Sequence, residues 1–239
     1  VDISSSFLNP YELEKLSLTN KKFRTKKIRD MINRIKFRAT NKNIREAVQA
    51  YLTNNLNKFG QSIWEYKYGY ISEWDVSKVT NMSHLFENAK NFNGDISKWD
   101  VSKVRNMEGM FQNAKNFNGD ISKWDVSKVR NMEGMFQNAK NFNGDISKWN
   151  ISNVRNMEGM FWGAKNFNQD INTKIVTRED GTKYTAWDVS NVTNMKHMFA
   201  SATKFNGDIS KWDVSKVRNM EYMFWGAKNF NQNIDTKED

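Results

Sequence analysis

Cysteine is absent from this chain of 239 residues. Its absence excludes disulfides, thiol catalysis and cysteine-based zinc sites. The sequence has only two histidines, His84 and His197, and a single proline, Pro10. It also lacks a run of about 18 apolar residues, the length that a membrane-spanning helix needs. We therefore expect no transmembrane segment and no thiol-dependent chemistry.

The positive charge is concentrated in the first quarter of the chain. The net charge is +10; residues 1–60 hold 13 lysines and arginines against 5 acidic residues, and residues 61–239 hold 24 against 22. A basic block is typical of segments that bind nucleic acid, an anionic membrane or an acidic protein surface, but also of a solvated helix face. We favour the solvated face and do not expect nucleic acid as a partner.

A unit of 25 residues, read most clearly as WDVSKVRNMEGMFQNAKNFNGDISK at 99–123, occurs six times. We call its tryptophan position 1. Successive copies begin 25 residues apart, except for one step of 38, at Trp74, Trp99, Trp124, Trp149, Trp187 and Trp212. A period in this range is the signature of a solenoid, in which each unit stacks on the next.

The apolar positions of the unit change period along its length. Positions 1 and 3 alternate as in a short strand, whereas positions 9, 12, 13 and 16 have the spacing of a short helix. A single unit buries too little apolar surface to offset the conformational entropy of ordering it, so each coil needs its neighbours. We therefore predict an α/β repeat solenoid with a short strand and a short helix in each coil.

This reading divides the chain into three parts. Residues 1–42 form a basic helical head, residues 43–73 a helical N-terminal cap, and residues 74–239 the six-coil solenoid. The long step between copies places an insertion at 174–186. Its centre, Asp180-Gly181, predicts the turn of a β-hairpin.

No set of residues suited to enzymatic chemistry is visible. Both histidines fall at position 11 of copies far apart in the array, so they cannot share a metal, and we interpret them as exposed surface residues. We find no acid–base pair, Ser/His/Asp set or phosphate-cradling glycine loop. Aspartates recur at positions 2 and 22. Rows of aspartate can bind calcium or cap turns, and we interpret these as turn caps. We predict no enzyme, no cofactor and no metal site.

Other positions are candidates for structure or for partner binding. Asparagine is invariant at positions 8 and 20, which we interpret as ladders that satisfy backbone groups. Arginine at position 7 has a glutamate three residues later in four copies, which predicts an exposed Arg–Glu ladder or a recognition face: Arg105, Arg130, Arg155 and Arg218. Tryptophan stands at position 14 twice, at Trp162 and Trp225. We interpret both as covers for coil edges, with exposed anchors for a partner as the alternative. Tyr184, in the insertion, is a further candidate for specificity.

The repeats resemble the BspA-like, DUF285-type family, a relative of the leucine-rich repeats. The pattern W-D-V-S-x-V-x-N-M-x-x-M-F-x-x-A-x-x-F-N-x-D-I-S carries the likeness, from Ile71 to about Ile234. The resemblance implies a curved solenoid, protein binding and no enzymatic activity. It also implies an origin among bacterial surface proteins, protists or large DNA viruses.

A second likeness lies in the head. Residues 7–24, FLNPYELEKLSLTNKKFR, are similar to the latter part of an F-box, although the first helix of that motif, with its Leu-Pro, is absent. This likeness implies that the head docks to a ubiquitin-ligase adaptor, with Leu13 and Leu16 as contacts, in an intracellular eukaryotic or viral setting.

We therefore expect a non-enzymatic scaffold for protein–protein interaction. Its solenoid would hold a protein target, and its head would dock to another protein, with a ubiquitin-ligase adaptor as the candidate. Two alternatives stay open: a structural component of a large assembly, such as a virus particle in which it bridges capsid proteins, and a cell-surface adhesin. We place the protein in the host cytoplasm or a virion ahead of the cell surface.

Overall fold

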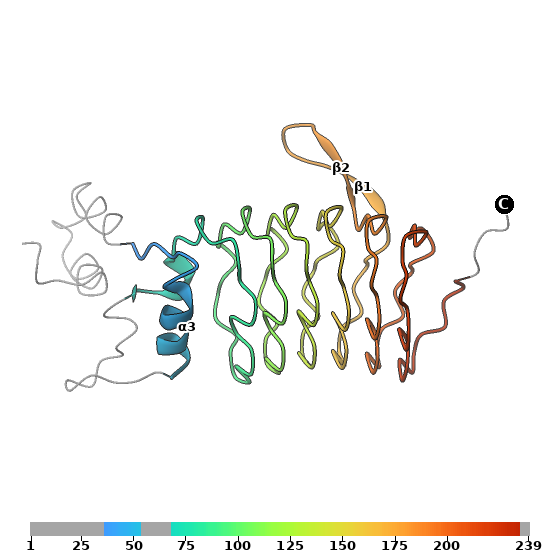
Figure 1. Cartoon of the computed structure of the whole chain (residues 1–239), viewed down its shortest axis with the longest axis horizontal. Helices are drawn as coiled ribbons and strands as arrows, with labels where there is room; N and C mark the ends of the chain where they lie inside the picture. The colour runs from blue at the N-terminus through green and yellow to red at the C-terminus, as the bar shows by residue number, and fades with distance from the viewer. Residues whose placement is uncertain (1–35, 54–67, 235–239) are drawn as a thin grey trace, which may run out of the picture.

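The computed structural model describes residues 36–53 and 68–234. Six coils, one for each copy of the repeat, lie side by side in a column, with a helix at the N-terminal end and a hairpin standing off one side (Figure 1). We number the coils 1 to 6 from the N-terminus. Most of the head, including the F-box-like segment with Leu13 and Leu16, lies outside the described residues.

The N-terminal end of the column is covered by helix α3, Ile44–Thr53, and by the short 3-10 helix η2, Ile71–Glu73. The buried side of α3 consists of Ile44, Ala47 and Val48, which join the core of the column. Within the described residues, neither helix has the length and apolar character required to cross a membrane.

Neighbouring coils are joined by rows of backbone hydrogen bonds. The N–H groups at positions 9, 11, 13 and 15 of one coil donate to the carbonyls at positions 8, 10, 12 and 14 of the next. Between coils 2 and 3 the donors are Met107, Gly109, Phe111 and Asn113, at 2.7 to 3.0 Å from their acceptors. The asparagines at position 8 form a parallel bridge at each step, beginning with Asn81 and Asn106.

The coils differ from the predicted strand-plus-helix units. Among the described residues of the repeats, the segment from position 10 to position 15 is a run of turns, and the strand at positions 1 to 3 is absent. The reason lies in the backbone, because Gly109 has a φ of 56° and Asn113 a φ of 59°. An α-helix needs φ near −63° at every residue, so these two positions interrupt it.

The turns nevertheless bury the repeated apolar side chains of coils 2 to 5. In coil 3, Met132, Met135, Phe136, Ala139 and Phe142 are all fully buried. The phenylalanine rings stack from coil to coil, with 5.7 Å between neighbouring centroids at position 13 for Phe136 and its counterpart in coil 4. Stacked rings at this spacing contribute packing beyond the area that they bury.

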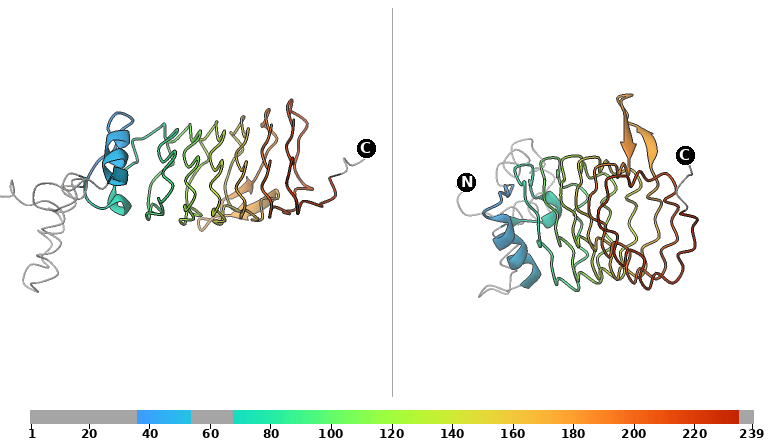
Figure 2. Two further views of the ribbon diagram at one scale, coloured as in Figure 1. Left: turned by 90° about the horizontal axis from the view of Figure 1, so that it is seen from below. Right: turned by 45° about the vertical axis from the view of Figure 1, so that its right-hand side comes forward.

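The insertion forms an antiparallel hairpin between β1, Lys174–Thr177, and β2, Lys183–Ala186. It projects away from the column, as Figure 1 and the right-hand view of Figure 2 show. Gly181 adopts a φ of 81° in the turn, a conformation that glycine adopts without strain. The Tyr184 hydroxyl donates to the carbonyl of Lys148 at 2.6 Å and fastens the hairpin to the column.

Candidate functional site

The glutamates at position 10 do not pair with the arginines at position 7, so the predicted Arg–Glu ladder is wrong. Arg105, Arg130, Arg155 and Arg218 are exposed, and among the described residues none of the four forms an ion pair. Asn131 Nδ2 instead donates to Glu108 Oε2 at 3.2 Å. The two following steps repeat this bond, through Asn156 to Glu133 and Asn194 to Glu158, both at 2.8 Å.

The asparagine at position 8 bonds to the glutamate through Nδ2, because its Oδ1 already accepts another hydrogen bond. Asn131 Oδ1 accepts the Glu133 N–H, two residues later, at 3.0 Å. Its Nδ2 therefore faces the preceding coil, where the glutamate lies. Burial raises the pKa of Glu133, and the charges of Glu108 and Glu158 on either side raise it further. This row supports the stack and leaves the arginines as isolated surface cations.

The aspartates at positions 2 and 22 cap turns. Asp95 Oδ1 accepts from both the N–H and the hydroxyl of Ser97, at 3.0 and 2.7 Å. The Ser97 hydroxyl lowers the pKa of Asp95 below its usual value. In the part of the chain that the structure describes, no three acidic, histidine or cysteine side chains converge as metal ligands would.

Position 11 separates the coils into two kinds. Its backbone is left-handed in all six, with glycine in coils 2 to 4 and larger residues in the others: His84, His197 and Tyr222, with φ between 54° and 56°. An L-residue pays roughly 1–2 kcal/mol for this conformation, which glycine avoids. Backbone strain of this kind clusters at functional sites.

Two of these strained residues join a tryptophan in a continuous surface feature. Trp162 lies 5.1 Å from His197, and His197 stacks on Tyr222 at 5.3 Å, in both cases between ring centroids. The three rings come from coils 4, 5 and 6, and we call them the aromatic strip. Trp162 is 37% exposed and Tyr222 57%. Trp225, three residues beyond Tyr222, is 62% exposed.

An ion pair lies beside the strip. Lys196 Nζ is 2.7 Å from Glu221 Oε2, so it joins coils 5 and 6 at the residues that precede His197 and Tyr222. The hydrogen bond raises the pKa of Lys196 and lowers that of Glu221. The strip therefore has a charged border of both signs.

The strip includes one predicted residue and two that sequence reasoning missed. Trp162 was a candidate, whereas His197 was interpreted as an ordinary surface residue and Tyr222 was not singled out. The signal that could have found them is the replacement of glycine at position 11, where the other copies keep it. The presence of glycine in some copies and of histidine or tyrosine in others shows that position 11 accepts side chains at a cost in backbone strain.

Trp162 does not cover an open coil edge, which corrects that interpretation. Phe161 N–H donates to the Met198 carbonyl at 2.9 Å and Gly163 N–H to the Ala200 carbonyl at 2.7 Å, so coil 4 has a regular neighbour beyond the insertion. Tyr184 is engaged within the hairpin, where the Arg178 guanidinium lies 4.3 Å from its ring centroid. It positions the hairpin.

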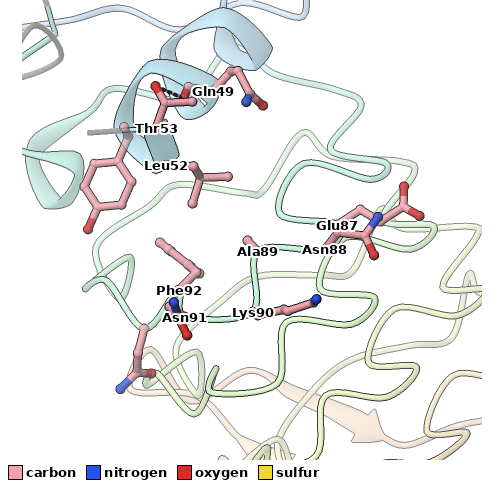
Figure 3. Close-up of a pocket in the computed structure, with 11 residues that line it drawn as sticks. Gln49, Leu52, Thr53, Glu87, Asn88, Ala89, Lys90, Asn91 and Phe92 are labelled. Atoms are coloured by element: carbon pink, nitrogen blue, oxygen red, sulfur yellow. Dashed lines mark hydrogen bonds between the residues drawn. The ribbon is translucent and has the colours of Figure 1, made fainter. Parts of the chain in front are cut away.

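A hollow of about 770 Å³ lies between α3 and coil 1 (Figure 3). Leu52 and Thr53 line it from the helix, and Asn88, Lys90 and Phe92 from the coil. The lining of the hollow combines amide and apolar groups with the charged side chains of Glu87 and Lys90. These groups do not form an arrangement typical of catalysis.

Repeated coils joined by backbone bonds, with one exposed aromatic strip, define a repeat protein without a recognisable catalytic centre among its described residues. A family model described as "Mycoplasma protein of unknown function, DUF285" matches residues 53–174 and 179–238. The chain belongs to this family, which confirms the resemblance carried by the repeat pattern. The interruption, at 175–178, falls inside the insertion. Neither the curated proteins nor the solved structures include a match to this chain.

Proposed function

We propose that this protein is a non-enzymatic solenoid scaffold that binds another protein through the aromatic strip. The observation that carries the proposal is the outward stacking of Trp162, His197 and Tyr222 across three coils. Tryptophan and tyrosine are the residues most enriched among the energetic centres of protein interfaces. Rings of this size supply contact area with few rotatable bonds to immobilise.

The contrast with the rest of the repeat supports this role. The tryptophans that open the coils are at most 9% exposed, so these large aromatic side chains serve the core. His197 and Tyr222 also occupy a backbone position at which glycine relieves strain. Aromatic side chains that stability alone does not favour are better explained by binding.

Selection of peptides from a displayed random library against the full chain tests the proposal. We expect peptides whose affinity falls at least tenfold for Trp162→Ala and for Tyr222→Gly. Tyr222→Gly relieves backbone strain, so loss of binding cannot be attributed to unfolding, and circular dichroism checks this for both variants. Ile175→Ser, which removes a more exposed apolar side chain from the hairpin, is the control. Selected peptides that bind both strip variants as tightly as the parent chain contradict the proposal.

The head is proposed as a separate docking segment on its likeness to an F-box over residues 7–24. A recombinant ubiquitin-ligase adaptor should bind the full chain, and the double change Leu13→Asp, Leu16→Asp should abolish binding. Trp162→Ala should leave this interaction intact, because the strip serves the other partner. Absence of adaptor binding to the parent chain removes this part of the proposal.

A further inference from the structure

The arginines at position 7 form a line of cations along coils 2 to 4. The backbone N–H of Arg130 donates to the Arg105 carbonyl, and that of Arg155 to the Arg130 carbonyl, both at 2.9 Å. Backbones bonded side by side in this way lie about 4.8 Å apart. Three exposed arginines therefore follow one another at the spacing of the coils.

Lysines at position 5 run beside this line. In coil 2 the Val104 N–H donates to the Val101 carbonyl at 2.8 Å, which closes a turn that contains Lys103. Val104 is fully buried, so Lys103 and Arg105 on either side of it point outward. We call the exposed cations of positions 5 and 7 in coils 1 to 4 the basic ridge: Lys78, Lys103, Arg105, Lys128, Arg130 and Arg155.

Within the described residues, the cations of the basic ridge have no counter-ion. Three lysines elsewhere in the same ranges each pair with a carboxylate: Lys98, Lys174 and Lys196. None of the ridge side chains does so. The acidic residues nearest in sequence bond to other groups, since Asp100 Oδ1 accepts from Ser102 N–H and Glu108 Oε2 from Asn131 Nδ2. The like charges of the ridge are therefore uncompensated.

Acidic rows on both sides limit the width of what the ridge can bind. Aspartates at position 2 precede the lysines by three residues, and glutamates at position 10 follow the arginines by three. A broad anionic surface, such as a membrane, would bring its charges against these carboxylates as well. Like charges in apposition oppose binding. A single extended chain can follow the cations alone.

The side chains of the ridge favour a polypeptide as this extended chain. Single-stranded nucleic acid is bound largely by stacking of its bases on aromatic side chains. The ridge carries none, because the exposed aromatic rings of the coils lie at positions 11 and 14. Arginine can donate two parallel N–H groups to one carboxylate. The three steps from coil 1 to coil 4 span about 14 Å, the length of about five residues of an extended chain.

We propose that the basic ridge binds an extended acidic segment of a partner protein, whose carboxylates pair with the cations of coils 1 to 4. The inference is independent of the aromatic strip. The strip consists of residues at positions 11 and 14 in coils 4 to 6, and it shares no residue with the ridge.

A capped peptide of glutamate residues is the probe, and calorimetric titration at low salt measures its affinity for the full chain. The test variant combines Arg105→Thr, Arg130→Thr and Arg155→Thr. Threonine is the residue that coils 1 and 5 carry at this position, as Thr80 and Thr193, so the fold accepts it. We expect the affinity to fall roughly tenfold, since three exposed ion pairs are lost together.

The control variant removes the same charge from the same coils at position 17, through Lys115→Thr, Lys140→Thr and Lys165→Thr. Coil 5 carries Thr203 there. Both variants keep the basic head, so a difference between them isolates the ridge. We expect the control to lose less than twofold in affinity. Circular dichroism checks that both variants fold.

Three results would count against the inference. Retained affinity in the arginine variant, equal losses in both variants, or no binding of the peptide to the parent chain at millimolar concentration overturns it. A heparin oligosaccharide or an oligothymidylate that binds more tightly than the peptide, with the same dependence on the arginines, overturns the choice of partner. Peptides selected on the aromatic strip should bind the arginine variant as tightly as the parent chain, which separates this inference from the proposed function.

Discussion

The indole Nε1 of Trp187 donates to the carbonyl of Ile146 at 2.8 Å, across 41 residues of sequence. The equivalent bond from Trp124 to Ile96 spans 28 residues. The contact is therefore the same on both sides of the insertion, and the extra residues loop out without shifting the register of the coils. The insertion between coils 4 and 5 therefore leaves the stacking of these coils unchanged.

Deletion of residues 174–186 should leave the column folded. The deletion restores the 25-residue step between Trp149 and Trp187 and removes two surface contacts of the hairpin, Tyr184 with Lys148 and Lys174 with Asp170. Such contacts contribute about 1 kcal/mol each or less. Thermal unfolding followed by circular dichroism should show a single transition within a few degrees of the parent. A broad or split transition would mean that the hairpin holds the two halves together.

The same substitution at position 9 should have very different costs in two coils. Met132→Ala removes a fully buried side chain between two coils, with an expected loss of about 2–5 kcal/mol in the free energy of unfolding. Met220→Ala, at 40% exposure on coil 6, should cost less than about 1 kcal/mol. Urea denaturation of both variants measures the difference. Equal losses would indicate that coil 6 is covered in solution.

Glycine at position 11 should be required for stability where it occurs. Gly134 has a φ of 55°, so Gly134→Ala should destabilise the fold by about 1 kcal/mol. Tyr222→Gly reverses the exchange at a φ of 54° and should be neutral or stabilising. Chemical denaturation of the two variants provides the comparison, and a destabilised Tyr222→Gly would show that the Tyr222 ring contributes more by stacking than its backbone costs.

Glu133→Gln should stabilise the column at neutral pH. The pKa of Glu133 is raised by burial and by the flanking glutamates, so the folded state disfavours its charged form. That penalty is absent well below the unfolded pKa of about 4.3, and it develops as the pH rises through the unfolded and then the folded value. Glutamine keeps an acceptor for Asn156 Nδ2 and carries no charge.

We expect a gain of roughly 0.5 kcal/mol at pH 7, since water screens much of the repulsion, and no gain at pH 3. Urea denaturation at both pH values measures it. Glu179→Gln, in the exposed hairpin turn, is the control and should change nothing. A gain that is the same at both pH values would rule out charge as its cause.

The sequence predicted which side chains form the core because the repeat displays the same apolar positions six times. Met132, Phe136 and Ala139 were expected to face inward, and all three are buried. The helix expected over them was not found, because their spacing suits a chain of turns equally well. Only the recurrence of glycine or asparagine at positions 11 and 15 distinguishes the two, through the left-handed φ that they adopt.

The polar contacts were harder to predict. Arg105 and Glu108 vary together along the array, which indicated a pair, but Asn131 of the next coil holds the glutamate. Sequence spacing cannot show that the asparagine at position 8 of the following copy is nearer. The hairpin could be predicted because Asp180-Gly181 is a strong local turn signal. The aromatic strip could not, because it joins residues of three copies and has no local signature.

The prevailing direction of the backbone hydrogen bonds between coils gives the column a net dipole along its axis. From position 8 to position 15, four peptide groups in each of coils 1 to 5 point their N–H toward the C-terminal end, and they outnumber the bonds at positions 7 and 18, which run the other way. Aligned peptide dipoles add, as they do in an α-helix, although here the positive pole lies at the C-terminal end. The negative pole is met by the guanidinium of Arg45 on the Ser83 carbonyl. Electron-rich groups should therefore be drawn to the last coil, and cations to the first.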